Sequence, residues 1–235
     1  MAIIKRLLCL ANSKKMSGRC VAGREVLDTG PGPWIRPVSA RPTEEVSEDE
    51  RQFQDGSDPR VLDIIDVALI LHHPHACQTE NWLLAPDYYW GKVEQVGWAE
   101  LQRYVEDPVS LWKNGRRTYH GANDEILQAD ADVLPNSLFL IHVSSLQLRV
   151  FSPGANFGNP KRRVQADFRH RGVRYKLWVT DPVIERAYKA LADGSYAIGE
   201  CCLCVSLGEP MPKLSGESCR YKLVATIIQR AGMQP

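Results

Sequence analysis

The sequence predicts a mainly β protein made of two small five-stranded barrels, with short helices and a mixed helical insert between them. Three observations lead to this fold class. Apolar and polar residues alternate over short runs, Gly, Pro and Asn separate these runs, and the order strand, strand, strand, helix, strand, strand occurs twice. At 235 residues with 44% hydrophobic content, the chain is long enough to form two such cores.

The first half supplies one set of these elements. A helix is expected after Ser47, because Ser47 and Glu50 have the spacing of a capping box, in which serine and glutamate satisfy unpaired backbone N–H groups. Strands are expected on both sides of this helix, at residues 3–10, 19–26, 34–38, 61–71 and 81–84.

Residues 86–136 do not fit barrel strands. Aromatic and apolar residues from Tyr88 to Val105 predict two short helices broken near Gly97, and Asn114-Gly115 predicts the tip of a basic turn. The aromatic residues fit either a core or a ligand platform. We therefore divide the chain into a first domain, residues 1–144 with this insert, and a second, residues 145–235.

The second half contains the clearest pattern, a hairpin around Arg171-Gly172. With a two-residue loop, the residue numbers of two paired positions sum to 343. In this register, every pair of side chains on one face of the hairpin is apolar. A helix begins at Asp181-Pro182 and is expected to stop at Gly194. Strands at 146–151, 200–207 and 221–229 complete the order of the OB-fold, which has its helix between the third and fourth of five strands. No residue repeat links the two halves.

The other face of this hairpin is predominantly basic. Arg169 is expected opposite Arg174, and like charges in that position are destabilising unless an anion or solvent compensates them. The face is therefore either a solvated surface or a site for an anion. Its residues are Arg163, Gln165, Asp167, Arg169, Arg174, Lys176 and Trp178.

Positive charge is concentrated in two segments. Residues 1–24 and 161–176 each carry a net charge of +6, whereas the whole chain carries +1, which leaves −11 for the rest. Such asymmetry is typical of proteins with an anionic partner. The acidic stretch from Glu44 to Asp66 is either the solvent-exposed face of the helix and the loop after it, or a mimic of a polyanion that docks onto a basic patch.

We expect no catalytic site, no metal and no cofactor. The Cys201-Cys202-Leu203-Cys204 run lacks a second cysteine pair and fits a buried strand, and the His72 to His75 cluster fits a turn at Pro74. The seven cysteines have no disulfide spacing, which indicates a reducing cytoplasm. No apolar run is long enough to cross a membrane.

Five strings of residues resemble the dual-OB-domain proteins of bacteria. They are CLANSKKMSGRCVAG at 9–23, WIRPVS at 34–39, QTENWLL at 78–84, FSPGANFGNPKRRVQA at 151–166 and LWVTDP at 177–182. The resemblance covers nearly the whole chain and implies two OB-folds and a nucleic-acid-binding or sensing role in bacterial conflict and antiphage defence. Residues 211–219 depart from it by lengthening the last loop, beside the usual ligand face.

An OB-fold binds oligonucleotides across its second and third strands and the adjoining loops. Gly18 and Ser17 would let backbone amides approach a phosphate, and Phe157 either stacks on a base or plugs the barrel end. The candidate residues are Lys14, Lys15, Arg19, Arg24, Trp34 and Arg36 in the first barrel, and Phe157, Asn159, Lys161, Arg162, Arg163, Arg169, Arg174, Lys176 and Trp178 in the second.

The leading hypothesis is a cytoplasmic module that binds nucleic acid, preferably single-stranded and without base readout. Six neutralised phosphates would give a log-log salt slope of about −4. One alternative is an adaptor that docks a partner enzyme through the aromatic insert and the acidic stretch. The other is a nucleotide-processing enzyme that uses His72, His73 or His75.

Overall fold

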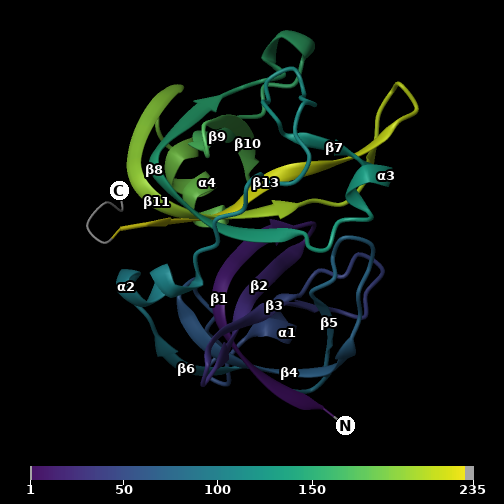
Figure 1. Cartoon of the computed structure of the whole chain (residues 1–235), viewed down its shortest axis with the longest axis vertical. Helices are drawn as coiled ribbons and strands as arrows, with labels where there is room; N and C mark the ends of the chain where they lie inside the picture. Colours follow the sequence, from purple (N-terminus) through teal and green to yellow (C-terminus); the bar gives the residue numbers. More distant parts are fainter. Residues whose placement is uncertain (1, 231–235) are drawn as a thin grey trace. The chain divides into compact units, whose positions relative to one another are not determined.

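The structure is a computed structural model that describes residues 2–230. The chain divides into two compact units, which we call the first and second units. The first contains residues up to 105 together with 135–137, and the second contains 106–134 and the residues from 138 onward. Both are mainly β with short helices, as the sequence predicts (Figure 1).

Five strands of the first unit close into a barrel. β1 pairs with β2 and with β4, β2 pairs with β3, and β5 joins β4 to β3 in the order of an OB-fold. The β3–β5 pairing is parallel and runs from Arg36↔Asn81 to Val38↔Leu83. The five strands are β1 (Ile3–Lys15), β2 (Gly18–Leu27), β3 (Gly30–Val38), β4 (Asp63–His72) and β5 (Asn81–Leu84).

The predicted capping box begins the helix of this barrel, α1 (Glu48–Arg51). The Ser47 side chain accepts a hydrogen bond from the Glu50 amide, and the Glu50 carboxylate accepts one from the Ser47 amide at 2.8 Å. The barrel core behind it is made of buried apolar side chains from all five strands. They include Leu7, Cys9, Val21, Ile35, Ile65, Val67, Leu69 and Leu84.

The region after β5 contains a strand where helix was predicted. β6 (Gly91–Gln95) is exposed along its whole length and pairs with the first residues of β4. The free edge of β4 offers backbone hydrogen bonds to this segment. Their contribution exceeds the weak helical preference that the spacing of a few aromatic side chains indicates. The helix begins only after Gly97, as α2 (Trp98–Leu101) followed by η1 (Gln102–Tyr104).

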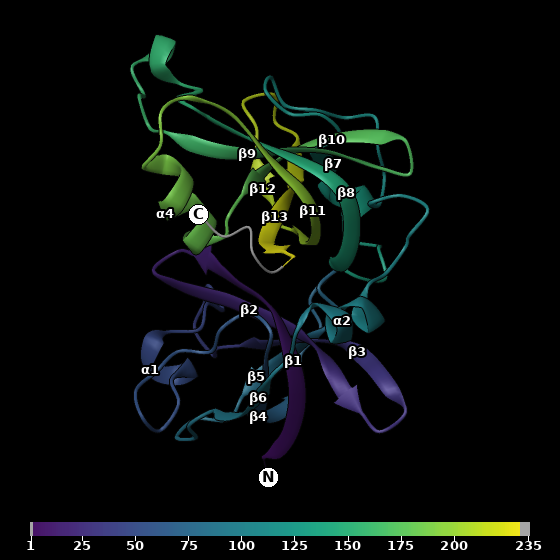
Figure 2. The ribbon, with the colours of Figure 1, turned by 90° about the vertical axis from the view of Figure 1, so that its left-hand side faces the viewer.

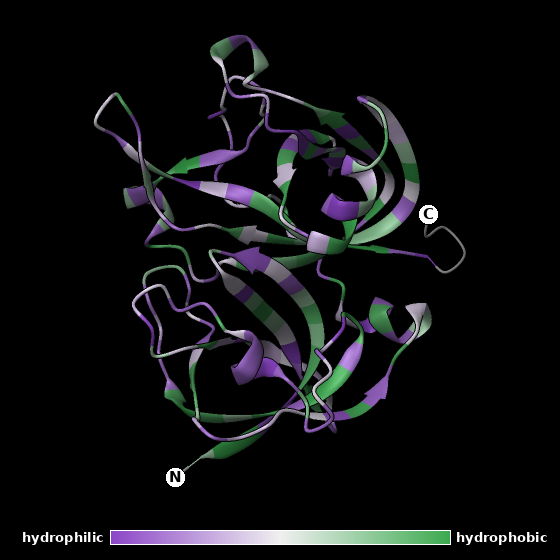
Figure 3. Cartoon of the chain, turned by 180° about the vertical axis from the view of Figure 1, so that it is seen from behind, coloured by the Kyte–Doolittle hydropathy of each residue, from purple (hydrophilic) through white to green (hydrophobic). Residues whose placement is uncertain are grey.

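The second unit contains a closed barrel of the same order. β8 pairs with β9 and β11, β9 with β10, β11 with β13, and β10 with β13 in parallel at Trp178↔Leu223. Bands of apolar and polar residues alternate along the strands of both units (Figure 3). The five strands are β8 (Leu138–Phe151), β9 (Arg163–His170), β10 (Val173–Val179), β11 (Gly194–Leu207) and β13 (Ser218–Gln229).

The predicted β9–β10 hairpin is confirmed residue by residue. Phe168 pairs with Tyr175 and Ala166 with Leu177, and all four side chains are buried. Arg171 and Gly172 have φ angles of +46° and +80°, as a two-residue hairpin loop of type I′ requires.

Asp181 caps α4 (Pro182–Lys189), as predicted, by accepting hydrogen bonds from the amides of Val183 and Ile184. The helix ends earlier than predicted, because Gly194 already begins β11. Figure 2 shows α4 beside one end of the second barrel.

Residues 106–134, which we had assigned to the first domain, belong to the second unit. β7 (Glu125–Leu127) pairs with β13, and α3 (Gln128–Ala131) follows it. Ala122 and Lys176 exchange backbone hydrogen bonds, and Lys222 donates its amide to the Asp124 carbonyl at 2.8 Å. The insert therefore fills the gap between β10 and β13. The boundary also lies before the expected residue 144, because β8 is continuous from Leu138.

The long last loop is a small hairpin. β12 (Met211–Pro212) pairs with the start of β13, and Leu214 at its tip is fully exposed. Among residues 2–230, no helix has the length and apolar character needed to cross a membrane.

Candidate functional site

Four aromatic rings follow one another on the outer face of the second barrel. Ring centroids lie 4.8 Å apart from Tyr119 to His120, 5.2 Å from His120 to Phe151, and 5.8 Å from Phe151 to Trp178. We call these four residues the aromatic row. Phe151 comes from β8, Trp178 from β10, and the other two from the insert. Tyr119, at the outer end, is 92% exposed.

Two arginines lie on this row. The Arg163 guanidinium is 4.1 Å from the centroid of the Trp178 ring, and that of Arg149 is 4.9 Å from the Phe151 ring. Among residues 2–230, neither guanidinium has a hydrogen bond or an ion pair with a carboxylate. Burial lowers the pKa of Arg163, against the influence of Glu185, but an arginine remains charged at neutral pH. Both positive charges thus lie on aromatic rings without a hydrogen bond or ion pair to a carboxylate, although Glu185 interacts with Arg163 at longer range.

Three other cations of the hairpin have carboxylate partners within the unit, which corrects the expectation of a positive face without any compensation. Arg174 donates two hydrogen bonds to Asp167, at 2.8 and 2.6 Å, and these raise its pKa. Lys176 also lies 3.9 Å from Asp167, and Arg171 pairs with Asp107. These carboxylate partners make the side chains of Arg174, Lys176 and Arg171 less available to bind phosphate.

Arg162, another predicted binding residue, has three partners within the second unit. Its guanidinium donates to Asp193 at 2.9 Å and to the carbonyl oxygens of Lys189 and Leu191. These carbonyls lie at the C-terminal end of α4, where unpaired acceptors and the helix dipole favour a cation. Arg169 lies opposite Arg174, as predicted, and donates to the Gly172 carbonyl at 2.7 Å.

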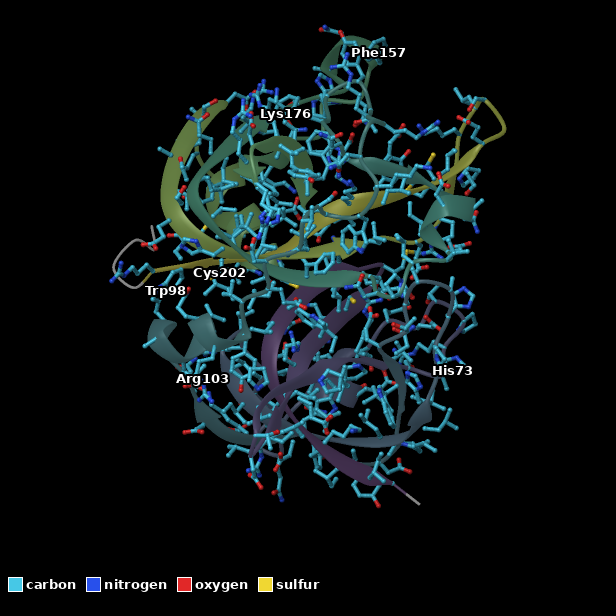
Figure 4. All side chains as sticks on the ribbon, viewed as in Figure 1. His73, Trp98, Arg103, Phe157, Lys176 and Cys202 are labelled. Carbon is cyan, nitrogen blue, oxygen red and sulfur yellow. The ribbon has the colours of Figure 1, made fainter. Side chains whose placement is uncertain are left out.

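The β8–β9 loop presents an aromatic side chain to solvent. Phe157, in η2 (Ala155–Phe157), is 84% exposed and lies at the tip of this loop (Figure 4), so it does not plug the barrel. Asn159 and Lys161 are exposed beside it. Among the described residues, the Lys161 ammonium has no ion pair.

The insert covers part of the predicted ligand face. Gln165 is fully buried and donates to the His120 carbonyl at 3.0 Å, and Asn123 donates to the Arg174 carbonyl. The covering element is therefore the insert. The aromatic row and the Phe157 loop are what remains accessible at this end of the face.

In the first barrel, the predicted residues are not assembled into one face. Arg36 is only 3% exposed, and its guanidinium lies 2.8 Å from both Glu80 and the Ser137 hydroxyl. It therefore holds the barrel together and is not a surface ligand. Arg24 donates to the Gly32 carbonyl and lies 5.9 Å from the Trp34 ring.

The β1–β2 turn packs at Gly18 against Val46, in the segment before α1. A Cβ there would lie 2.5 Å from the Val46 carbonyl oxygen, and Arg19 and Val46 exchange backbone hydrogen bonds of 2.9 Å. Ser17 donates to Glu45, so an acid occupies this position. Lys14 is exposed, Lys15 and Arg19 are half-buried, and all three lie at this turn.

Trp34 instead lines a cavity of about 490 Å³ in the first unit. Trp82 and His72 lie beside it with their rings 5.1 Å apart, and the Lys5 ammonium is 4.8 Å from the Trp82 ring while it pairs with Glu25. Trp82 and Lys5 were not among the residues predicted to bind a ligand in the first barrel.

The two units also differ in net charge. The first has twelve Lys and Arg against fifteen Asp and Glu, a net charge of −3, and the second has seventeen against thirteen, a net charge of +4. The positive segment at residues 1–24 is therefore balanced within its own unit, and the segment at 161–176 is not.

The cysteines form no disulfide. All seven are free, and Cys201, Cys202 and Cys204 are fully buried in β11 as predicted. Burial raises the pKa of Cys201 to about 12, so its thiol stays protonated. Among residues 2–230, no group of three or more His, Cys, Asp or Glu side chains could hold a metal ion. β4 ends at His72, and a turn follows at His75–Gln78.

Two members of the site could have been found from the sequence and two could not. Arg149 and Phe151 share the outward face of β8 by simple alternation. Tyr119 and His120 belong to an irregular segment, and only the tertiary structure brings them to the face.

No curated protein and no solved structure matched the chain. The family model described as "Dual OB-containing domain" matches residues 5–227, which agrees with the two barrels described above. The chain therefore belongs to the dual OB-containing domain family.

Proposed function

We propose that the second barrel binds single-stranded nucleic acid through the aromatic row, without catalysis and with little dependence on sequence. The observation that supports this most is that the guanidiniums of Arg149 and Arg163 lie on Phe151 and Trp178 without an ion pair to a carboxylate among residues 2–230. Membership of a dual OB family adds to it, because OB-folds commonly receive oligonucleotides on this face.

Each part of the site matches one part of a nucleotide. Bases stack on aromatic rings and on guanidinium planes, and each stacked base contributes roughly 1–3 kcal/mol. Tyr119 and Phe157 are the most exposed rings, and Lys161 lies near the latter in the chain to receive a phosphate. Stacking requires unpaired bases, which favours single strands over a duplex.

The first experiment measures fluorescence anisotropy with labelled dT15, rU15 and a 15-base-pair DNA duplex. The Arg149→Glu/Arg163→Glu variant is compared with Arg186→Glu, since Arg186 is exposed on α4 in the same unit. We expect the Kd for dT15 or rU15 to rise at least tenfold in the double variant and to change less than threefold in the control.

The double variant changes the net charge by −4 and the control by −2. A loss of binding free energy in the double variant no more than twice that in the control would therefore show that only net charge matters, and would contradict the proposed site. Failure of the wild-type protein to bind any of the three probes at low salt would contradict the proposed function. The probes are also expected to remain intact, so shortened products would contradict a non-catalytic role.

The family resemblance suggests a setting, namely a sensor or accessory protein of bacterial defence. The free cysteines support a reducing compartment, the bacterial cytoplasm. Plaque counts on bacteria that express wild-type protein or Arg149→Glu/Arg163→Glu test this setting. We expect fewer plaques with the wild-type protein, and equal counts would contradict it.

A further inference from the structure

One cavity of the first unit combines exposed aromatic side chains with an acidic rim. It has a volume of about 600 Å³ and lies beside α1, β4 and the segment after β5. Tyr88 and Tyr89 are 54% and 61% exposed, and Ile70, at the end of β4, is 37% exposed. Such a concentration of exposed apolar surface is typical of an interaction site.

The polar part of the rim is acidic. Asp49 and Glu50 of α1 and Asp87 line the cavity, and no Lys, Arg or His does so. Asp49 and Asp87 have exposed side chains without a hydrogen bond or ion pair among residues 2–230. Glu50 pairs with Arg41 at 2.9 Å. Burial alone would raise the pKa of Glu50, but hydrogen bonds from Ser47 and Ser39 and the charge of Arg41 outweigh it and lower the pKa. The carboxylates of the rim without a partner are therefore those of Asp49 and Asp87.

This combination selects for a particular chemistry. The faces of tyrosine rings attract ammonium and guanidinium groups, and carboxylates close by add direct charge complementarity. The apolar floor, which includes Leu83, Ala85 and Pro86, is suited to an aliphatic side chain next to that cation. A nucleic acid would be repelled by this rim, so the cavity differs in kind from the aromatic row.

We infer that the first unit docks an extended segment of a partner protein in which Lys or Arg alternates with aliphatic residues. The inference does not depend on nucleic-acid binding by the second barrel. It gives the acidic unit an interaction of its own, through Tyr88, Tyr89, Asp49 and Asp87.

The test uses three fluorescein-labelled peptides in anisotropy titrations at 150 mM salt. One alternates Lys with Leu, the second replaces each Lys with Glu, and the third replaces each Leu with Ser. We expect saturable binding of the Lys-Leu peptide, at least tenfold weaker binding of the Lys-Ser peptide, and no binding of the Glu-Leu peptide.

Two variants and one matched control locate the contact. Tyr88→Ala/Tyr89→Ala removes exposed rings, and Asp49→Lys reverses a rim charge, so each is expected to raise the Kd of the Lys-Leu peptide at least tenfold. Glu48→Lys makes the same charge change on the adjacent residue of α1, which does not line the cavity, and a change below threefold is expected. Unchanged far-ultraviolet circular dichroism verifies that the variants are folded.

Three results would overturn the inference. They are no binding of the Lys-Leu peptide by the wild-type protein, equal weakening by Glu48→Lys and Asp49→Lys, and a wild-type dimer in sedimentation that Tyr88→Ala/Tyr89→Ala dissociates. The last would identify a second copy of the chain as the occupant.

Discussion

The two barrels share one strand order but differ in what their corresponding faces carry. On β3 of the first barrel, Arg36 is buried against Glu80, whereas on β10 of the second barrel Trp178 lies on the outer face with Arg163 over its ring. The net charges of the units are −3 and +4. The fold therefore supplies the same position for a ligand in both barrels, and the side chains at that position determine whether a ligand binds there.

The insert creates a further difference. In the first barrel, the parallel strands β3 and β5 pair over three residue pairs, from Arg36 to Val38. In the second, β10 and β13 pair over two, and residues 122–124 fill the remaining gap with hydrogen bonds to Lys176 and Lys222. The insert also places His120 in the aromatic row. One segment therefore completes the barrel and contributes a ring to the proposed site.

The largest expected effect concerns stability. Arg36→Ala should lower the free energy of unfolding of the first unit by about 3–5 kcal/mol, because it leaves the Glu80 carboxylate buried without its partner. Arg163→Ala, in the second unit, should change stability far less. Urea unfolding followed by tryptophan fluorescence measures both, and equal costs would contradict the distinction between a structural and a ligand-binding arginine.

A smaller effect is expected at a buried lysine of the second barrel. Lys222 is fully buried, donates to the Lys113 carbonyl and the Asn114 side chain, and lies 5.3 Å from the Tyr175 ring. Burial lowers the pKa of Lys222 to about 7, while Asp124 opposes this shift. In the unfolded chain its pKa is about 10.4.

Between these two values the unfolded state binds more protons than the folded state. The contribution of Lys222 to stability therefore rises with pH above 7, by at most about 1.4 kcal/mol per pH unit. Cys9 and Cys201, whose pKa values burial raises to about 12, act in the opposite direction above about pH 8.5. Urea titrations of wild type and Lys222→Met from pH 7 to 8.5 isolate the effect; parallel pH profiles would contradict it.

The next prediction distinguishes which of the two barrels binds the oligonucleotide. Tyr119→Ala and Phe157→Ala each remove one exposed ring, and each should weaken rU15 or dT15 binding by about 1–3 kcal/mol. Lys14→Glu, at the exposed turn of the first barrel, should change the Kd less than threefold. A stronger effect of Lys14→Glu in anisotropy titrations would assign binding to the first barrel.

Local signals account for most of what the sequence predicts. The hairpin register follows from a two-residue turn, and the Ser47–Glu50 capping box from a spacing of three residues. The compensation of Lys176 was also available, because Asp167 and Lys176 sum to 343 and are opposite one another. These features depend on neighbours in the chain or across one turn.

What the sequence did not reveal depends on distant pairings. Arg36 has the alternation of a surface residue, but Glu80 and Ser137, far along the chain, enclose it. The insert has no period that indicates a place between β10 and β13. Likewise, β6 forms because an edge of β4 is available to it, which no local pattern of side chains encodes.

The salt dependence of oligonucleotide binding shows directly which cations of the second barrel bind phosphate. Arg149, Lys161 and Arg163 are the cations of the site without a carboxylate partner among the described residues, so the log-log slope for dT15 or rU15 should be about −2, from roughly −0.7 per contact. In Arg149→Gln/Arg163→Gln it should fall to about −0.7. A slope near −4 that the double substitution leaves unchanged would contradict the account, because the paired cations of the hairpin would then be the ones that bind phosphate.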